Sequence, residues 1–234
     1  MIRSFFHTGD IGDIIAALPT IRSLGGGELV IGYKPNGQRE SLRGARFEAI
    51  VPLLLAQPYI SGVRWGDAPR GCLDFSRFRE TPDNGMSLAH HQADYAGAVE
   101  ISVDPWLTID PVTHGRPVIA RSARYHNTDF PWMEVLRRLK DPIFVGLPQE
   151  HAAFCAFTRS NVEHVRCGNL LQLARTIAGG SLFVGNQSAP FWIAAGLGGR
   201  CVQESWIAAP NSTIHRKGMF YPMRMDYDID ACLR

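Results

Sequence analysis

The sequence predicts an α/β protein built from two successive halves, each with its own parallel sheet. Short apolar runs of strand length alternate with helical patterns along the 234 residues. A glycine-containing turn joins a strand to a helix twice, at 8–13 and at 185–190. Between them, the stretch 104–117 carries three prolines and a Thr-His-Gly turn, after which the alternation starts again. We therefore expect one domain over 1–112 and a second over 113–234.

The first half begins with a βαβ pattern. Ile2 to His7 reads as a strand, apolar residues then recur at helical spacing from Ile14 to Leu24, and Leu29 to Gly32 reads as a second strand. This order is typical of a parallel sheet, and Pro19 is expected to kink the helix. The remaining expectations are a helix at 47–56, strands at 63–65 and 72–75, a loop over 77–92 and a helix at 93–99.

The second half repeats the alternation. Strands are expected at 118–121, 142–146, 164–166, 181–184 and 200–203, with helices at 131–139, 170–178 and 189–197. Ligands of such folds bind where the strands end at their carboxyl edge. With two halves, the expected ligand site is the cleft between them.

Composition excludes several classes of protein. Lys and Arg number 24 against 22 Asp and Glu, a net charge of +2, which gives no electrostatic argument for bulk nucleic-acid binding. With 45% hydrophobic and 20% charged residues the chain is not of a disordered type. It has no apolar run of membrane-spanning length and no signal-peptide pattern, and its five cysteines form no CxxC pair. We expect a reduced, cytoplasmic protein with buried thiols.

The first segment with chemical potential is the turn HTGDIGD, residues 7–13. Its glycines allow the backbone to approach a ligand, but it lacks the Gly-Lys-Ser/Thr of a P-loop. Asp10 and Asp13 oppose an anion at this place, and a carboxylate there suits a general base that takes a proton from a hydroxyl. Asp13 equally suits a helix cap, and both interpretations stay open.

The second segment is the turn over 183–190. Small residues before a helix leave amide groups and the positive helix end available to a diphosphate. The candidate contacts are Asn186, Gln187, Ser188 and Ala189, with Ser188 also a natural N-cap. A plain capped helix explains the same residues.

Two further candidates follow strands of the second half. Arg121, Ser122 and Arg124 come after the strand at 118–121, where arginines bind phosphate oxygens in bidentate fashion. Glu204 follows the strand at 200–203, where an acidic side chain accepts hydrogen bonds from ribose hydroxyls. Solvated surface positions are the alternative for the two arginines and for Glu204. No metal site is expected, because His90-His91 lacks a third ligand and the acidic run 226–230 lacks the glycine and glutamate of a calcium loop.

Two segments resemble a known family. TGDIGDIIAALPTIRSL resembles the amino-terminal signature of the family 9 glycosyltransferases, the ADP-heptose:lipopolysaccharide heptosyltransferase group, through Gly12-Asp13 and Leu18-Pro19. VGNQSAPFWIAAGLG resembles the family's donor-site segment GNDSGPxHxAAALG. The resemblance implies a GT-B fold, with two Rossmann-like domains facing across a cleft, a nucleotide-sugar donor on the second domain and no metal or other cofactor.

The resemblance also implies roles for individual residues. Asp13 matches the position of the catalytic base, and Thr8 and Asp10 lie beside it as acceptor-side candidates. The donor-binding candidates are Gly12, Ser122, Arg124, Asn186, Gln187, Ser188, Ala189 and Glu204. The chain departs from the family at Gln187 (usually Asp), Ala189 (usually Gly) and Trp192 (usually His), so the identity of the sugar is left open.

The expected function is transfer of a sugar from a nucleoside-diphosphate sugar to an acceptor hydroxyl, inverting and without metal. The acceptor is a glycan, a small molecule or modified DNA. Two alternatives stay open. One is a non-catalytic GT-B relic that binds a nucleotide or a partner. The other is a GT-B enzyme that glycosylates hydroxylated bases in DNA, using the arginine-rich stretch from Arg116 to Arg138 on the phosphates.

Overall fold

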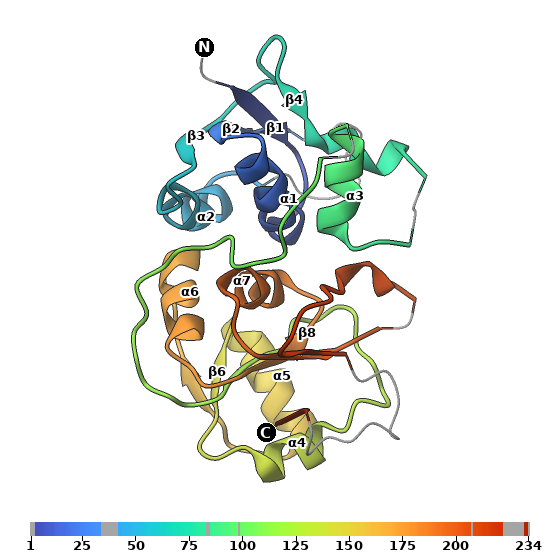
Figure 1. The fold of residues 1–234 in the computed structure, drawn as a ribbon. Coiled ribbons are helices and arrows are strands. Elements are labelled where there is room, and N and C mark those ends of the chain that lie inside the picture. Colours follow the sequence, from blue (N-terminus) through green and yellow to red (C-terminus); the bar gives the residue numbers. More distant parts are fainter. Residues whose placement is uncertain are drawn as a thin grey trace. The chain divides into compact units, whose positions relative to one another are not determined.

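The computed structural model describes residues 3–33, 42–82, 85–97, 99–206, 208–221 and 232–233. The chain divides into two compact units (Figure 1). The N-terminal unit is Met1–Thr108 together with Asn169–Leu171, and the C-terminal unit is Ile109–Gly168 together with Gln172–Arg234. The acidic run 226–230 lies outside the described residues.

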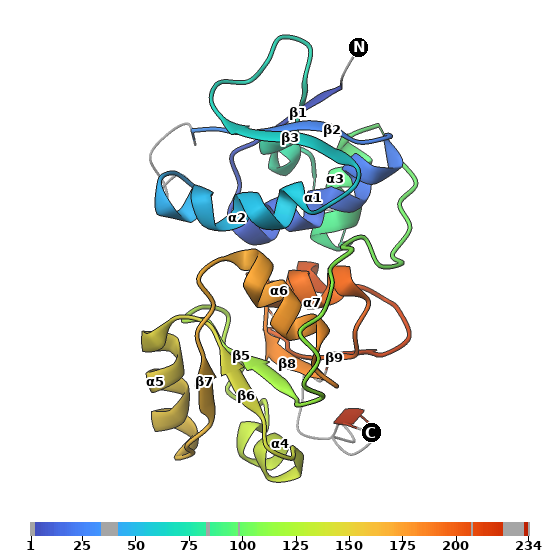
Figure 2. The ribbon, with the colours of Figure 1, turned by 90° about the vertical axis from the view of Figure 1, so that its left-hand side faces the viewer.

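The N-terminal unit contains a four-stranded parallel sheet in the order β3-β2-β1-β4. Its elements are β1 (Ser4–His7), α1 (Ile11–Ser23), β2 (Gly27–Ile31), α2 (Ala45–Leu55), β3 (Ile60–Trp65), β4 (Leu73–Asp74), the 3₁₀ helix η1 (Phe75–Glu80) and α3 (Leu88–Tyr95). Helices α1 and α2 lie along the same face of this sheet (Figure 2). This is the arrangement that right-handed crossovers from β1 to β2 to β3 produce.

The predicted βαβ start of the chain is confirmed. Ile14, Ile15, Leu18 and Ile21 of α1 are completely buried, and Pro19 lies inside this helix. After α1 the chain turns sharply, and Gly26 has a φ of +77°. A Cβ atom at Gly26 would lie 2.1 Å from the carbonyl oxygen of Tyr59, so only glycine fits where the chain passes from α1 into β2.

The C-terminal unit contains a six-stranded parallel sheet in the order β10-β9-β8-β5-β6-β7. Its elements are β5 (Val118–Ala120), α4 (Trp132–Arg138), β6 (Ile143–Val145), α5 (Pro148–Thr158), β7 (Glu163–Val165), α6 (Leu170–Ala178), β8 (Phe183–Asn186), α7 (Ala189–Leu197), β9 (Cys201–Glu204), the 3₁₀ helix η2 (Pro210–Ser212) and β10 (Met219–Phe220). Counted within the unit, this order is 3-2-1-4-5-6 read from β7, the order of the Rossmann fold.

The structure corrects several element predictions. The stretch 77–92 is not a loop, because η1 occupies part of it and α3 begins at Leu88 rather than at residue 93. The Ser87 side chain accepts a hydrogen bond from the His90 amide and fixes the start of α3. Helix α5 and strand β10 were not predicted. In α5 only Phe154 and Thr158 are buried, so its sequence carries little apolar periodicity.

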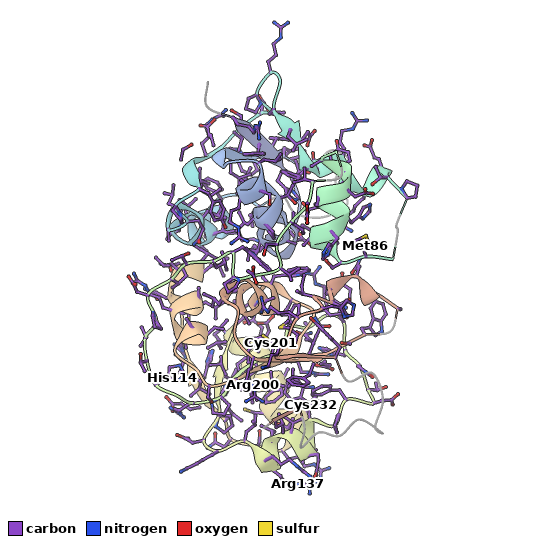
Figure 3. All side chains as sticks on the ribbon, in the orientation of Figure 1. Met86, His114, Arg137, Arg200, Cys201 and Cys232 are labelled. Carbon is purple, nitrogen blue, oxygen red and sulfur yellow. The ribbon has the colours of Figure 1, made fainter. Side chains whose placement is uncertain are left out.

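The cysteines are free thiols, but the prediction that all are buried is wrong. Cys201 and Cys232 are buried in the C-terminal unit (Figure 3), whereas Cys72, Cys155 and Cys167 are half-buried. Burial raises the pKa of the Cys201 thiol to about 12. Across the described part of the chain, every helix is too short or too polar to cross a membrane.

Candidate active site at two topological switch points

Each sheet has one place where neighbouring strands connect in opposite directions. In the N-terminal unit this switch point lies between β1 and β4, and in the C-terminal unit it lies between β5 and β8. Ligands of open parallel sheets bind in the crevice at such points, outside the carboxyl ends of the strands. The HTGDIGD turn follows β1, and the candidate turns at 121–127 and 186–189 follow β5 and β8. The predicted site residues therefore lie in the loops that this fold uses for ligands.

Asp13 is held by one group on each carboxylate oxygen. Its Oδ2 atom accepts a hydrogen bond from the Asp10 amide at 3.1 Å, so the helix-cap interpretation is correct. Its Oδ1 atom accepts a hydrogen bond from Arg79 Nη2 at 2.8 Å, and Arg79 comes from η1, which follows β4. The Asp13 side chain retains 13% exposure. Each carboxylate oxygen has a second lone pair, so capping does not prevent Asp13 from accepting a proton.

A buried pair of polar side chains is hydrogen-bonded to the turn that contains Asp13. His7 and Gln92 are fully buried. The Gly9 amide donates to His7 Nδ1 at 2.8 Å, and His7 Nε2 lies 3.1 Å from Gln92 Oε1. Gln92 Nε2 then donates to the carbonyl oxygen of Asp13 at 2.9 Å. Because Nδ1 accepts, the ring is neutral with its proton on Nε2. Burial lowers the pKa of His7, in keeping with this state, although the Asp13 carboxylate opposes the shift.

Gly9 is required by the same packing. A Cβ atom at Gly9 would lie 2.4 Å from His7 Cε1 and 2.6 Å from Asp13 Cβ. Thr8 is buried beside it, and Asp10 is the N-cap residue of α1. The turn is thus packed tightly against its own neighbours, which fixes where the Asp13 carboxylate lies.

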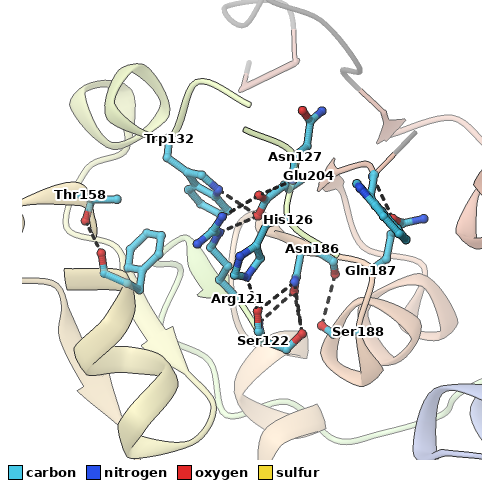
Figure 4. Close-up of polar contacts among 12 residues, drawn as sticks. Arg121, Ser122, His126, Asn127, Trp132, Thr158, Asn186, Gln187, Ser188 and Glu204 are labelled. Atoms are coloured by element: carbon cyan, nitrogen blue, oxygen red, sulfur yellow. Dashed lines mark hydrogen bonds and ion pairs between the residues drawn. The ribbon is translucent and has the colours of Figure 1, made fainter. Parts of the chain in front are cut away.

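In the C-terminal unit, Asn186 bonds to the loop after β5 (Figure 4). Its Oδ1 accepts from the Ser122 amide at 3.0 Å, and its Nδ2 donates to the Ser122 carbonyl and Oγ at 3.1 Å each, and to the Arg124 carbonyl. Asn186 is completely buried. The side-chain amide of Asn186, at the end of β8, thus fixes the positions of Ser122 and Arg124 in the loop after β5.

Gln187 holds a second loop. Its Oε1 accepts from the Trp206 amide at 2.8 Å, and its Nε2 donates to the carbonyl of Ala209. The side chain is 5% exposed. An amide serves here because one donor and one acceptor are both needed, and an aspartate at this position has only acceptors. The departure from the family pattern at position 187 thus has a structural reason.

Glu204 is completely buried and accepts four hydrogen bonds (Figure 4). Arg121 donates through Nε and Nη2 at 2.8 and 2.9 Å, the Asn127 amide donates at 2.9 Å, and Trp132 Nε1 donates at 3.0 Å. A contact with a ribose would require one of these bonds to break, since a carboxylate has about four lone-pair positions. Arg121 is likewise committed to Glu204, which leaves Arg124 as the arginine of this loop nearest to solvent.

Ser188 and Ala189 begin α7 as predicted. Ser188 is the N-cap residue, but its Oγ donates to the Asn186 carbonyl at 3.2 Å instead of capping the helix. Ala189 is the first residue of α7. Trp192 is 2% exposed and its ring packs against that of Phe191, so its indole is buried in the C-terminal unit.

The structure brings Ser122, Arg124, Asn186, Gln187, Ser188, Ala189 and Glu204 to one edge of the six-stranded sheet. Gly12 lies in the first turn of α1 in the other unit, beside Asp13. Sequence reasoning missed Arg79 and Gln92, which bond to Asp13 from 66 and 79 residues away. It also gave no role to His7, whose ring accepts a hydrogen bond from the Gly9 amide two residues on. No group of three or more potential metal ligands occurs among the described residues.

Comparison with known proteins shows which solved structures share this fold. No family model matches the chain, and a search of the curated proteins finds no match. Solved structures do match. An E. coli heptosyltransferase WaaC with ADP is 11% identical, with 95% of this chain and 94% of that chain covered and a TM-score of 0.64. A family 9 glycosyltransferase from Veillonella parvula is 12% identical, with 95% and 86% covered and a TM-score of 0.59.

A third solved structure that matches is described as containing iron. The iron-containing dodecameric glycosyltransferase TibC of enterotoxigenic E. coli is 15% identical, with 97% of this chain but 64% of that chain covered and a TM-score of 0.58. All three matches extend over nearly the whole of this chain. The chain thus has the fold of the heptosyltransferases and family 9 glycosyltransferases, and the predicted GT-B-like architecture is confirmed.

Proposed function

We propose that this protein is a glycosyltransferase that moves a sugar from a nucleoside-diphosphate sugar to an acceptor hydroxyl. The observation that carries the proposal is the position of the two candidate turns. Each follows a strand at the switch point of its own parallel sheet, in a fold shared with WaaC, which has been solved with ADP. In the proposal the loops after β5 and β8 hold the donor diphosphate, and the Asp13 turn serves the acceptor.

The proposed chemistry follows from the groups at each turn. Asp13 takes the proton of the acceptor hydroxyl, and the oxygen attacks the anomeric carbon as the bond to the diphosphate breaks. The nucleoside diphosphate leaves with the electron pair. Arg124 and the amides at the start of α7 stabilise its charge, together with the positive end of that helix. Attack from the side opposite the leaving group inverts the anomeric centre, and no metal is required in this scheme.

Donor turnover tests the proposal. We expect the purified protein to release a nucleoside diphosphate from one member of a panel of ADP-, UDP- and GDP-sugars when acceptor is present. Asp13→Asn should abolish turnover and leave donor affinity unchanged, because the amide cannot accept the proton. Asp67→Asn, at an exposed position of the same unit, is the control. Retained turnover in Asp13→Asn refutes the role of Asp13, and donor binding without turnover in the wild type favours a non-catalytic module.

A further inference from the structure

Two aromatic side chains lie together at the carboxyl edge of the six-stranded sheet. Tyr125 belongs to the loop after β5, and Trp206 to the loop after β9. Their ring centroids are 5.5 Å apart, with an angle of 39° between the planes. Trp206 is 37% exposed and Tyr125 is half-buried, whereas Trp106, Trp132 and Trp192 are at most 2% exposed. The pair is thus an aromatic surface outside the core.

The backbone of Tyr125 is strained. Its φ is +58°, in the left-handed region that a bulky side chain rarely adopts. Such residues persist where the surroundings hold them in place, and they gather at ligand sites. The Arg124 guanidinium lies 5.4 Å from the centroid of the Tyr125 ring, so a cation accompanies the aromatic pair.

Asn186 and Gln187 hold both loops. Asn186 donates to the carbonyl of Arg124, the residue directly before Tyr125. Gln187 accepts from the Trp206 amide at 2.8 Å. Both amide side chains are at most 5% exposed, so these bonds are protected from water. Adjacent residues at the tip of β8 therefore position the two aromatic residues.

We infer that Tyr125 and Trp206 form a stacking surface for the nucleobase of the donor, and that Asn186 and Gln187 are its positioning residues. An exposed ring offers its face to any nucleobase, since every base has a π-face. Arg124, next to Tyr125 in the chain, carries the positive charge that the attached diphosphate needs. The inference rests on the proposed function, because it names the residues that bind one part of that donor.

Binding measurements on the full chain test the inference. The probes are ADP, UDP and GDP, with pyrophosphate and ribose 5-phosphate as probes that lack a base. We expect Trp206→Leu to weaken binding of the tightest nucleoside diphosphate by about 5- to 150-fold and to leave pyrophosphate affinity unchanged. Trp206→Phe should recover most of the affinity, because it keeps a ring. Trp65→Leu is the matched control, since Trp65 is also 37% exposed but lies in the N-terminal unit.

Fluorescence and a Gln187 variant supply independent readouts. In Trp65→Leu, Trp206 is the one exposed tryptophan of the described residues, and its emission should be quenched by the nucleoside diphosphate and not by pyrophosphate. Gln187→Leu should weaken nucleoside diphosphate binding in the same direction, because it removes the acceptor of the Trp206 amide. If the wild type binds no nucleotide, the proposed function fails. If the wild type binds but Trp206→Leu binds equally well, or loses pyrophosphate to the same extent, only the stacking surface is overturned.

Discussion

Arg79 Nη2 donates to Asp13 Oδ1 at 2.8 Å and so connects η1, which follows β4, with the first turn of α1, which follows β1. The two strands flank the switch point of the four-stranded sheet. Arg79 also lies with its guanidinium 4.6 Å from the centroid of the Phe78 ring, which restrains the side chain on η1. The proposed base is thus oriented by a residue that lies 66 positions away in the chain.

We predict that Arg79→Gln lowers kcat by about 10- to 100-fold without changing donor affinity, because a misplaced base costs rate and not binding. The arginine is 55% exposed, so the free energy of unfolding should change by less than about 1 kcal/mol. Steady-state kinetics and urea unfolding measure the two quantities. Arg77→Gln, which removes the neighbouring pair with Glu80, is the control. Equal kinetics in both variants would contradict the orienting role.

The second prediction concerns pH. Burial lowers the pKa of His7 in the folded protein, so below about pH 6.5 the unfolded chain binds a proton that the folded chain does not. Above that pH the neutral His7 does not make the free energy of unfolding depend on pH. Below it, the free energy of unfolding falls as the pH drops toward the folded pKa, by up to about 1.4 kcal/mol per pH unit. Urea unfolding between pH 7.5 and 5 should show a smaller pH slope in His7→Gln. An unchanged slope in His7→Gln would contradict this contribution of His7.

Glu204→Gln is expected to lower the free energy of unfolding by about 3–5 kcal/mol. The change leaves Arg121, 10% exposed, without its counter-charge and turns a donor group toward other donors. Glu163→Gln breaks a pair between Arg116 and a 58% exposed carboxylate in the same unit and should cost less than about 1 kcal/mol. Urea unfolding compares the two variants. Similar costs would mean that the buried pair contributes no more than the exposed one.

Gly9→Ala should lower the free energy of unfolding by about 1–3 kcal/mol, because the added methyl group overlaps His7 and Asp13. The same shift displaces the Asp13 carboxylate, so turnover should fall as well. At Gly62 the nearest atom to an added Cβ is Glu28 Cγ at 3.8 Å, so Gly62→Ala should be neutral or slightly stabilising. Thermal unfolding and turnover of both variants check the prediction, and a neutral Gly9→Ala would show that the turn has room.

The sequence predicts the fold well where its motifs are local. Strand, glycine turn and helix follow each other within 24 residues at the N-terminus, and the same order recurs around 183–197. Helix α5 escaped prediction because it buries only two residues. The sequence feature that indicates α5 is Pro148 in the first turn with Glu150 two residues later, which is typical of a helix start. No periodic apolar residues follow it to indicate the rest of the helix.

The sequence indicates the turn residues of the candidate site but not the distant residues that hold them. Turn residues such as Asp13 and Ser188 are visible because glycine and small residues mark their loops. Their partners are not, because the hydrogen bond between His7 and Gln92 joins residues 85 positions apart. Predicting a loop over 77–92 also concealed Arg79 and Gln92, which η1 and α3 bring to the turn.

The bonds of Asn186 and Gln187 have a consequence for motion. Asn186 ends β8 and Gln187 directly follows it, and the two neighbours bond to the loops after β5 and β9, the strands on either side of β8 in the sheet. A small displacement of the strand tip is therefore transmitted to both loops at once, and neither can rearrange alone without losing its amide bonds. A molecule that immobilises one loop should slow amide hydrogen exchange in the other, so that 121–127 responds together with Trp206 and Ala209 as a single cooperative unit.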